Sequence, residues 1–170
     1  MMVHLQEKGI AENTLILFLG DNGSDAPLGN KKGYTSSAPL REKKGSEYEG
    51  GMRVPFIACR TQPDGRNKWQ KQLPIQAEGI QRQMGTVMDL YPTLVNLAGA
   101  KLPEHYTLDG YNLHTQLTGQ RNENRPEMFL MHFPHDHRGS YFTTYREENW
   151  KLIYYYTPKC PTDLYANFTT

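Results

Sequence analysis

Two short motifs in the first third of the chain carry groups that can bind ions. Asp21-Asn22-Gly23 sets a carboxylate beside an amide oxygen, and hard oxygen ligands of this kind suit Ca²⁺ or Mg²⁺. Two oxygens do not complete a metal site, however, and Asp, Asn and Gly are also the residues of an ordinary turn. Taken by itself, the tripeptide predicts a turn before it predicts a metal site.

The second motif, residues 43–51, reads Lys-Lys-Gly-Ser-Glu-Tyr-Glu-Gly-Gly. A lysine among glycines can hold a tetrahedral anion, because the ammonium is flexible and glycine lets the backbone approach a ligand closely. Arg41 and Arg53 flank the motif and could join in anion binding or pair with neighbouring glutamates. The competing interpretation is a solvated, charged loop without a ligand.

Three histidines, His132, His135 and His137, stand within six positions near the C-terminal end. They could ligate a metal or recognise an anion or a hydroxyl group of a substrate. In a strand, His135 and His137 would share a face. No cysteine or carboxylate spacing completes a zinc pattern, which favours histidines beside a binding cleft over metal ligands. An inert surface loop is the alternative.

No local motif supports another kind of catalysis. The sequence contains no Gly-x-Ser-x-Gly, no Walker loop and no Gly-x-Gly-x-x-Gly, the motifs of the common serine hydrolases and nucleotide-binding proteins. A Ser-His-Asp triad stays open, because the members of a triad need not be close in sequence.

Short apolar segments must position the two ion-binding motifs. Residues 14–19 form an almost continuous apolar run that predicts a buried strand of a parallel sheet. Asp21 follows the carboxyl end of this strand, where open α/β sheets bind ligands. Residues 24–51 predict a long functional loop. Residues 53–59 predict a second buried strand, and 61–71 an exposed turn.

The rest of the chain divides into a helical and a β-rich part. From residue 80 to residue 98 the apolar positions keep helical spacing, with Thr86 or Asp89 as the cap and Gly99 as the stop signal. Beyond Pro126, three aromatic segments predict a small antiparallel sheet; they are residues 128–133, 141–146 and 150–157.

The predicted fold class is therefore α/β, in two parts. Residues 1–119 would form the end of a mixed α/β sheet domain, and residues 120–170 a small α+β subdomain with an antiparallel sheet.

Composition excludes several classes of function. The 170 residues are 37% hydrophobic, enough for a core. With 19 Lys and Arg against 18 Asp and Glu, no overall charge attracts the chain to nucleic acid or to an anionic membrane. No apolar run is long enough to span a membrane. Cys59 and Cys160 do not settle the redox compartment.

The order of the motifs, more than any one of them, resembles the sulfatase family of the alkaline-phosphatase superfamily. The resemblance spans nearly the whole chain. The matching segments, in family order, are Asn13-Thr14-Leu15-Ile16-Leu17-Phe18, Asp21-Asn22-Gly23, Ala38-Pro39-Leu40-Arg41, residues 44–55, Asp89-Leu90-Tyr91-Pro92-Thr93-Leu94, Ala98-Gly99, Leu108-Asp109-Gly110 and Trp150-Lys151-Leu152-Ile153.

The resemblance implies a sulfuric ester hydrolase with an alkaline-phosphatase-like fold. In that family, residues matching Asp21 and Asn22 are Ca²⁺ ligands, and the lysine matching Lys44 contacts the sulfate group of the substrate. The histidine-rich segment of relatives often faces the substrate pocket, which makes His132 and His135 candidate substrate-binding residues. The partner would be a sulfate ester, with sulfated carbohydrates as one class. Lys43 departs from the glycine usual at its position.

The family's nucleophile is not in this sequence. Sulfatases convert the Cys or Ser of a Cys/Ser-x-Pro/Ala-x-Arg signature into formylglycine, but neither Cys59-Arg-Thr-Gln-Pro nor Cys160-Pro-Thr-Asp-Leu matches it. The resemblance thus implies the C-terminal part of a sulfatase, with the formylglycine and further calcium ligands upstream, and an isolated chain that is inactive. By analogy the protein would be periplasmic, secreted or lysosomal.

Two other functions stay open. One is a phosphoesterase or phosphotransferase of the same superfamily, since its members share metals and tetrahedral anions. The other is a non-catalytic module that binds sulfated glycans through the lysine-containing loop.

Overall fold

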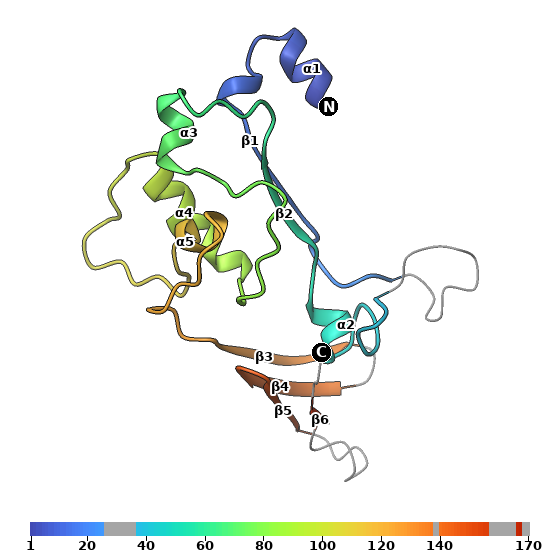
Figure 1. Ribbon diagram of the computed structural model, residues 1–170. Coiled ribbons are helices and arrows are strands. Elements are labelled where there is room, and N and C mark those ends of the chain that lie inside the picture. Colours follow the sequence, from blue (N-terminus) through green and yellow to red (C-terminus); the bar gives the residue numbers. More distant parts are fainter. Residues whose placement is uncertain (26–36, 138–139, 157–165, 168–170) are drawn as a thin grey trace. The chain divides into compact units, whose positions relative to one another are not determined.

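The computed structural model describes residues 1–25, 37–137, 140–156 and 166–167 (Figure 1). It is mixed α/β with an antiparallel sheet, as predicted. Its helices are α1 (Met2–Glu7), η1 (Ala11–Asn13), α2 (Glu49–Met52), α3 (Lys68–Gln72), η2 (Val87–Asp89), α4 (Leu90–Leu97) and α5 (His114–Leu117). Its strands are β1 (Leu15–Leu19), β2 (Phe56–Arg60), β3 (Met128–His137), β4 (Ser140–Glu147), β5 (Trp150–Tyr155) and β6 (Ala166–Asn167). Among the described residues, no helix has the length and apolar character that crossing a membrane requires.

The chain forms two compact units, and both are discontinuous in sequence. The first unit contains Met1–Phe18 and Ile57–Pro126, and the second contains Leu19–Phe56 and Glu127–Thr170. Residues 19–56, which carry both ion-binding motifs, therefore pack with the C-terminal sheet. The boundary expected after residue 119, between the end of the larger domain and a small C-terminal subdomain, stays a prediction.

The two predicted strands at residues 14–19 and 53–59 are present as β1 and β2, which pair with each other. The expectation that they are buried is wrong for this chain, because Phe18 and Ile57 are each 57% exposed. Within the described ranges the sheet contains these two strands only. A run of apolar residues thus predicted the strand, but other layers must cover a strand before it is buried.

The helix predicted between residues 80 and 98 is shorter than its apolar pattern and forms as η2 and α4. Thr86 and Asp89 are their respective N-cap residues, and Gly99 follows with a positive φ of 65° that suits glycine after a helix. Asp89 is fully buried and accepts hydrogen bonds from Tyr111 N at 2.8 Å and from Arg125 Nη2 at 2.7 Å. This carboxylate holds the start of α4 against later segments of the first unit.

The exposed turn predicted at residues 61–71 is partly wrong, because α3 begins within it. Asn67 is the N-cap, and its side-chain oxygen accepts hydrogen bonds from Trp69 N at 2.9 Å and Gln70 N at 3.3 Å. Asparagine is a favoured N-cap residue, so the signal for this helix was present in the sequence.

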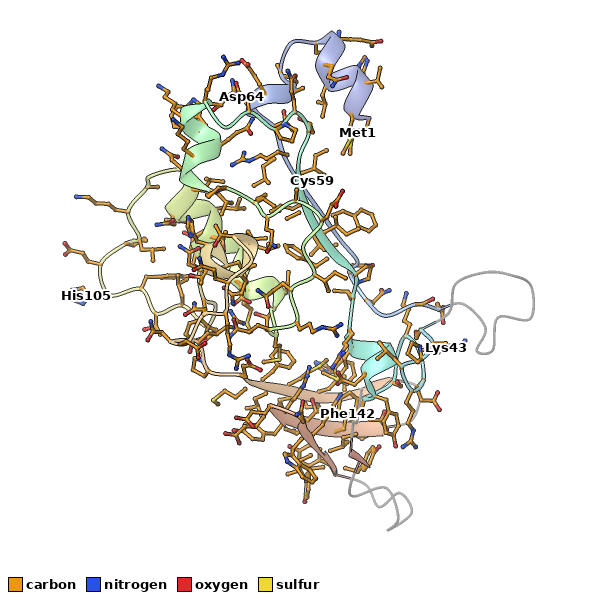
Figure 2. The ribbon with its side chains drawn as sticks, in the orientation of Figure 1. Met1, Lys43, Cys59, Asp64, His105 and Phe142 are labelled. Atoms are coloured by element: carbon orange, nitrogen blue, oxygen red, sulfur yellow. The ribbon has the colours of Figure 1, made fainter. Side chains whose placement is uncertain are left out.

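The second unit is built on the predicted antiparallel sheet, whose strand order is β3-β4-β5-β6. Because side chains alternate across a strand, one face of the sheet carries Phe142 and Ile153, and both are buried with Tyr48 in a core cluster. Phe133 packs against this cluster, and its ring stacks on that of Phe142 at 5.2 Å. Figure 2 labels Phe142 on this sheet.

Candidate functional site

The structure brings the two ion-binding motifs together by backbone hydrogen bonds. Asp21-Asn22-Gly23 follows β1 directly, and Gly23 N donates to Gly51 O at 3.1 Å. In the other direction, Lys44 N donates to Ser24 O at 3.0 Å. The predicted calcium loop and the predicted sulfate-binding loop are therefore joined by two backbone hydrogen bonds within the second unit.

Glycines make this close approach possible. A side chain at Gly23 would collide with Gly50 O and would come within 2.7 Å of Gly51 O. A side chain at Gly50 would in turn come within 2.6 Å of Arg41 O. These glycines are needed because another backbone passes beside them, rather than because of an unusual backbone angle.

Asp21 and Asn22 are the two predicted oxygen ligands, and they follow β1 directly. Asp21 is exposed, and within the described residues its carboxylate makes no hydrogen bond or ion pair. The side-chain nitrogen of Asn22 donates to Gly23 O at 3.1 Å, which leaves the amide oxygen to act as a ligand. Two oxygens fall short of the 6–8 that Ca²⁺ takes. In the described part of the chain, no three His, Cys, Asp or Glu side chains converge.

The two adjacent lysines of the loop have different surroundings. Lys43 Nζ lies 3.6 Å from Asp25 Oδ1, and the two side chains are 36% and 52% exposed. Lys44 is half-buried, and its backbone is fixed by Ser24. Figure 2 labels Lys43 on the loop that leads to α2.

A buried carboxylate at the start of α2 gathers three cations from two parts of the chain. Glu49 Oε1 lies 2.9 Å from Lys151 Nζ on β5, and Glu49 Oε2 contacts Arg53 and lies 3.6 Å from Arg146 on β4. The side chains of Glu49 and Lys151 are 5% and 2% exposed. Burial by itself raises the pKa of Glu49, but the cations outweigh it and hold this pKa below its usual value.

A second carboxylate of the same loop contacts the same strand. The hydroxyl of Tyr155 on β5 donates a hydrogen bond to Glu47. Burial of the phenol, followed by this hydrogen bond to the carboxylate, raises the pKa of Tyr155 well above its usual value. Tyr48, between the two glutamates, is buried beneath Arg41, whose guanidinium lies 3.7 Å from the centre of the ring.

The two candidate histidines have different neighbours. His132 is exposed, and its ring nitrogen Nδ1 lies 2.8 Å from Thr143 Oγ1 and 3.3 Å from the hydroxyl of Tyr156. His135 packs edge-on against Phe133, at a ring distance of 5.6 Å, and Phe133 belongs to the face that covers Tyr48. His135, but not His132, thus contacts the side of the sheet that packs on the lysine loop. The side chain of His137 lies outside the described residues.

Glu49, Lys151 and Tyr155 were not identified from the sequence, although a signal existed. In the strand predicted at residues 150–157, alternation puts Lys151 on the same face as Ile153 and Tyr155. A lysine on the buried face of a strand needs a carboxylate partner, so its position could have prompted a search for one.

Comparison with known proteins gives consistent relatives. The family model described as Sulfatase matches residues 2–100. Arylsulfatase A of Homo sapiens is 34% identical over 82% of this chain and 25% of its own length. Steryl-sulfatase of Mus musculus is 29% identical over 100% of this chain and 26% of its own length. The chain therefore spans about a quarter of the length of these two curated relatives.

One relative is named for a sugar substrate, and one has a solved structure. N-acetylgalactosamine-6-sulfatase of Canis lupus familiaris is 34% identical over 72% of this chain and 21% of its own length. A crystal structure from Bacteroides thetaiotaomicron, assigned as a sulfatase, matches with a TM-score of 0.55 and 20% identity. It covers 91% of this chain and 30% of that one, and it supports the fold.

Proposed function

The chain belongs to the sulfatase family, and from that premise we propose that the whole protein hydrolyses sulfate esters. In this proposal Asp21 and Asn22 are calcium ligands, and Lys44 holds the sulfate group of the substrate. The observation that carries it is the backbone pairing of the two loops through Gly23 with Gly51 and Lys44 with Ser24. This pairing places the backbone that carries Asp21 and Asn22 beside the backbone that carries Lys44, which supports the proposal.

The chemistry of the two loops suits a sulfate ester. Charge builds up on the oxygens of the reacting group during hydrolysis, and fixed positive groups around it lower the barrier. Ca²⁺, when bound by Asp21 and Asn22 together with ligands from outside this chain, would supply part of that positive charge. Lys44 would supply another part from a loop that is held in place by backbone hydrogen bonds. The nucleophile, a formylglycine in this proposal, would come from residues upstream.

The relatives' names support the proposed substrate class. Arylsulfatase A, steryl-sulfatase and N-acetylgalactosamine-6-sulfatase differ in the alcohol that their names imply. We therefore propose a sulfate ester, with sulfated sugars as one candidate class. His135 is the better placed of the two histidines for a role in substrate specificity, because it packs on Phe133 beside the core cluster. His132 stays a weaker candidate.

The first test is hydrolysis of an aryl sulfate with added Ca²⁺, by the protein extended upstream through its native gene. Lys44→Ala should lower kcat/KM by about 10²–10³, the range for removing one group that stabilises a developing anion. Lys43→Ala is the matched control, because Lys43 pairs with Asp25 at the surface, and it should stay within a few-fold of the parent. Asp21→Ala should raise the Ca²⁺ concentration needed for activity.

Three results would contradict this proposal. The first is equal activity of the Lys44→Ala and Lys43→Ala variants. The second is turnover of an aryl phosphate in place of the aryl sulfate, which would indicate a phosphoesterase. The third is binding of a sulfated glycan with no turnover by the extended protein, which would indicate a non-catalytic module.

A further inference from the structure

We propose that Glu49 and Lys151 form a positioning pair that holds the lysine loop, residues 43–51, in the geometry that binds the sulfate group. This inference rests on the proposed function for its catalytic meaning. Glu49 and Lys151 bond each other, and their role would be to act through the backbone of the loop.

The pair joins two segments that are far apart in sequence. Lys151 Nζ donates to Glu49 Oε1 at 2.9 Å, across 102 positions of sequence. Both side chains are almost completely buried, with exposed fractions of 2% and 5%. An ionic contact that is shielded from solvent and hydrogen-bonded in this way permits one relative placement of β5 and α2.

A second contact makes the attachment rigid. Glu47 and Glu49 lie two positions apart on the loop, and Tyr155 and Lys151 lie four positions apart on β5. The hydroxyl of Tyr155 bonds Glu47, as Lys151 bonds Glu49. Two contacts fix the direction of the loop as well as its distance from β5.

The effect reaches Lys44 and the predicted calcium ligands through backbone hydrogen bonds. Gly50, next to Glu49, donates to Arg41 O at 2.8 Å, and Gly51 O accepts from Gly23 N at 3.1 Å. Within the same loop, Ser46 N donates to Lys43 O at 3.1 Å, and this hydrogen bond closes the turn that contains Lys44. A shift of Glu49 would therefore move the backbone on both sides of the predicted ion-binding groups.

A buried ion pair is better suited to fixing geometry than to adding stability. Removing two charges from water has a free-energy cost that offsets most of their attraction, so an apolar pair of similar size is often as stable. Removing one partner is far more harmful, because the other charge is left buried. These two rules allow stability and positioning to be separated by experiment.

The decisive variant is the double substitution Glu49→Gln with Lys151→Met in the upstream-extended protein. It removes both buried charges and should unfold closer to the parental temperature than Glu49→Gln alone. Glu49→Gln leaves Lys151 buried without its carboxylate, whereas Arg53 and Arg146 keep access to solvent. If the pair positions the loop, the double variant should still show a KM for aryl sulfate, and an inhibition constant for inorganic sulfate, raised about tenfold to a hundredfold. Lys151→Arg should recover part of the loss.

A second measurement does not depend on activity. Amide hydrogen exchange in peptides covering residues 40–52 should be faster in the double variant, because the amides of Lys44, Gly50 and Gly51 donate the hydrogen bonds of the loop. Exchange in peptides covering residues 86–99 should not change, since they belong to the first unit.

Arg125→Met supplies the matched control, because it breaks a buried ion pair of similar length in the first unit, Arg125 to Asp89 at 2.7 Å. It should lower the unfolding temperature and leave both KM and loop exchange at parental values. A double variant with parental KM and parental exchange would overturn the positioning role. Sulfatase activity absent from the parent itself would instead contradict the proposed function, and the exchange data alone would then decide whether the pair holds the loop.

Discussion

At the scale of single residues, the phenol of Tyr155 is unusual because it is partly buried and donates to a carboxylate. Burial and the bond to Glu47 both favour the protonated phenol, which raises the pKa of Tyr155 above its usual value. A folded-state pKa above the unfolded one means that the bond stabilises the fold fully below about pH 10. The stabilisation is then lost as pH rises toward the folded-state pKa.

Tyr155→Phe should therefore lower the unfolding temperature at pH 8. Between pH 8 and pH 11, the unfolding temperature of this variant should decrease less than that of the parent. The substitution removes the hydroxyl, so the unfolded state no longer gains by releasing that proton. Thermal unfolding followed by circular dichroism across this pH range measures both effects. Tyr154→Phe is the control, since Tyr154 is the exposed neighbour on the same strand. An equal alkaline loss in the parent and in Tyr155→Phe would show that the bond does not form.

At the scale of elements, the two ion-binding loops depend on the absence of side chains where their backbones meet. Gly23→Ala should cost about 1–3 kcal/mol of unfolding free energy, the usual range for an overpacked site, because the new methyl group would meet the backbone oxygens of Gly50 and Gly51. Chemical denaturation gives this free energy. Gly65→Ala is the matched control, since nothing lies within 4 Å of its added carbon.

The elements also show what a sequence can and cannot predict. Alternation and aromatic content predicted β3, β4 and β5, and helical spacing with Gly99 predicted α4, because both signals are local. Alternation along β5 could place Lys151 on the buried face, but nothing local identifies Glu49 as its partner, since the contact spans 102 positions. The burial of β1 was wrongly predicted, because burial depends on which other layers are present.

The candidate site divides in the same way. Asp21, Asn22 and Lys44 were predicted from residue chemistry and motif order, and the structure brings their two loops together by hydrogen bonds. Their ligand roles stay predictions. The different settings of His132 and His135 required the strand register, in which His132 is opposite Thr143, because a change of one position moves a side chain to the other face.

At the scale of the whole molecule, the first unit exposes apolar side chains that normally pack against protein. Val87, Tyr91 and Leu94 recur at helical spacing along η2 and α4 and are all exposed. The chain also matches only about a quarter of the length of its curated relatives. Contiguous apolar surface on a soluble protein marks an interaction site or promotes association.

The 170-residue chain by itself should therefore associate and bind an apolar dye. Raising the sulfate concentration should strengthen the association, because such salts favour burial of apolar surface, whereas association through charges would weaken. Light scattering and dye fluorescence measure both. Replacing Tyr91 with Lys and Leu94 with Glu should reduce the effect. A chain that stays monomeric and does not increase the fluorescence of the dye would show that this surface does not drive association.

The discontinuity of the second unit has a consequence for gene shuffling between sulfatases. Any single crossover placed between residues 57 and 126 would leave Glu49 and Lys151 on segments inherited from different parents. Such a chimera stays compatible only when both parents carry an acidic and a basic residue at these positions. Exchange of residues 19–56 together with 127–170, as one cassette, would keep Glu47 and Glu49 with the β5 strand of the same parent.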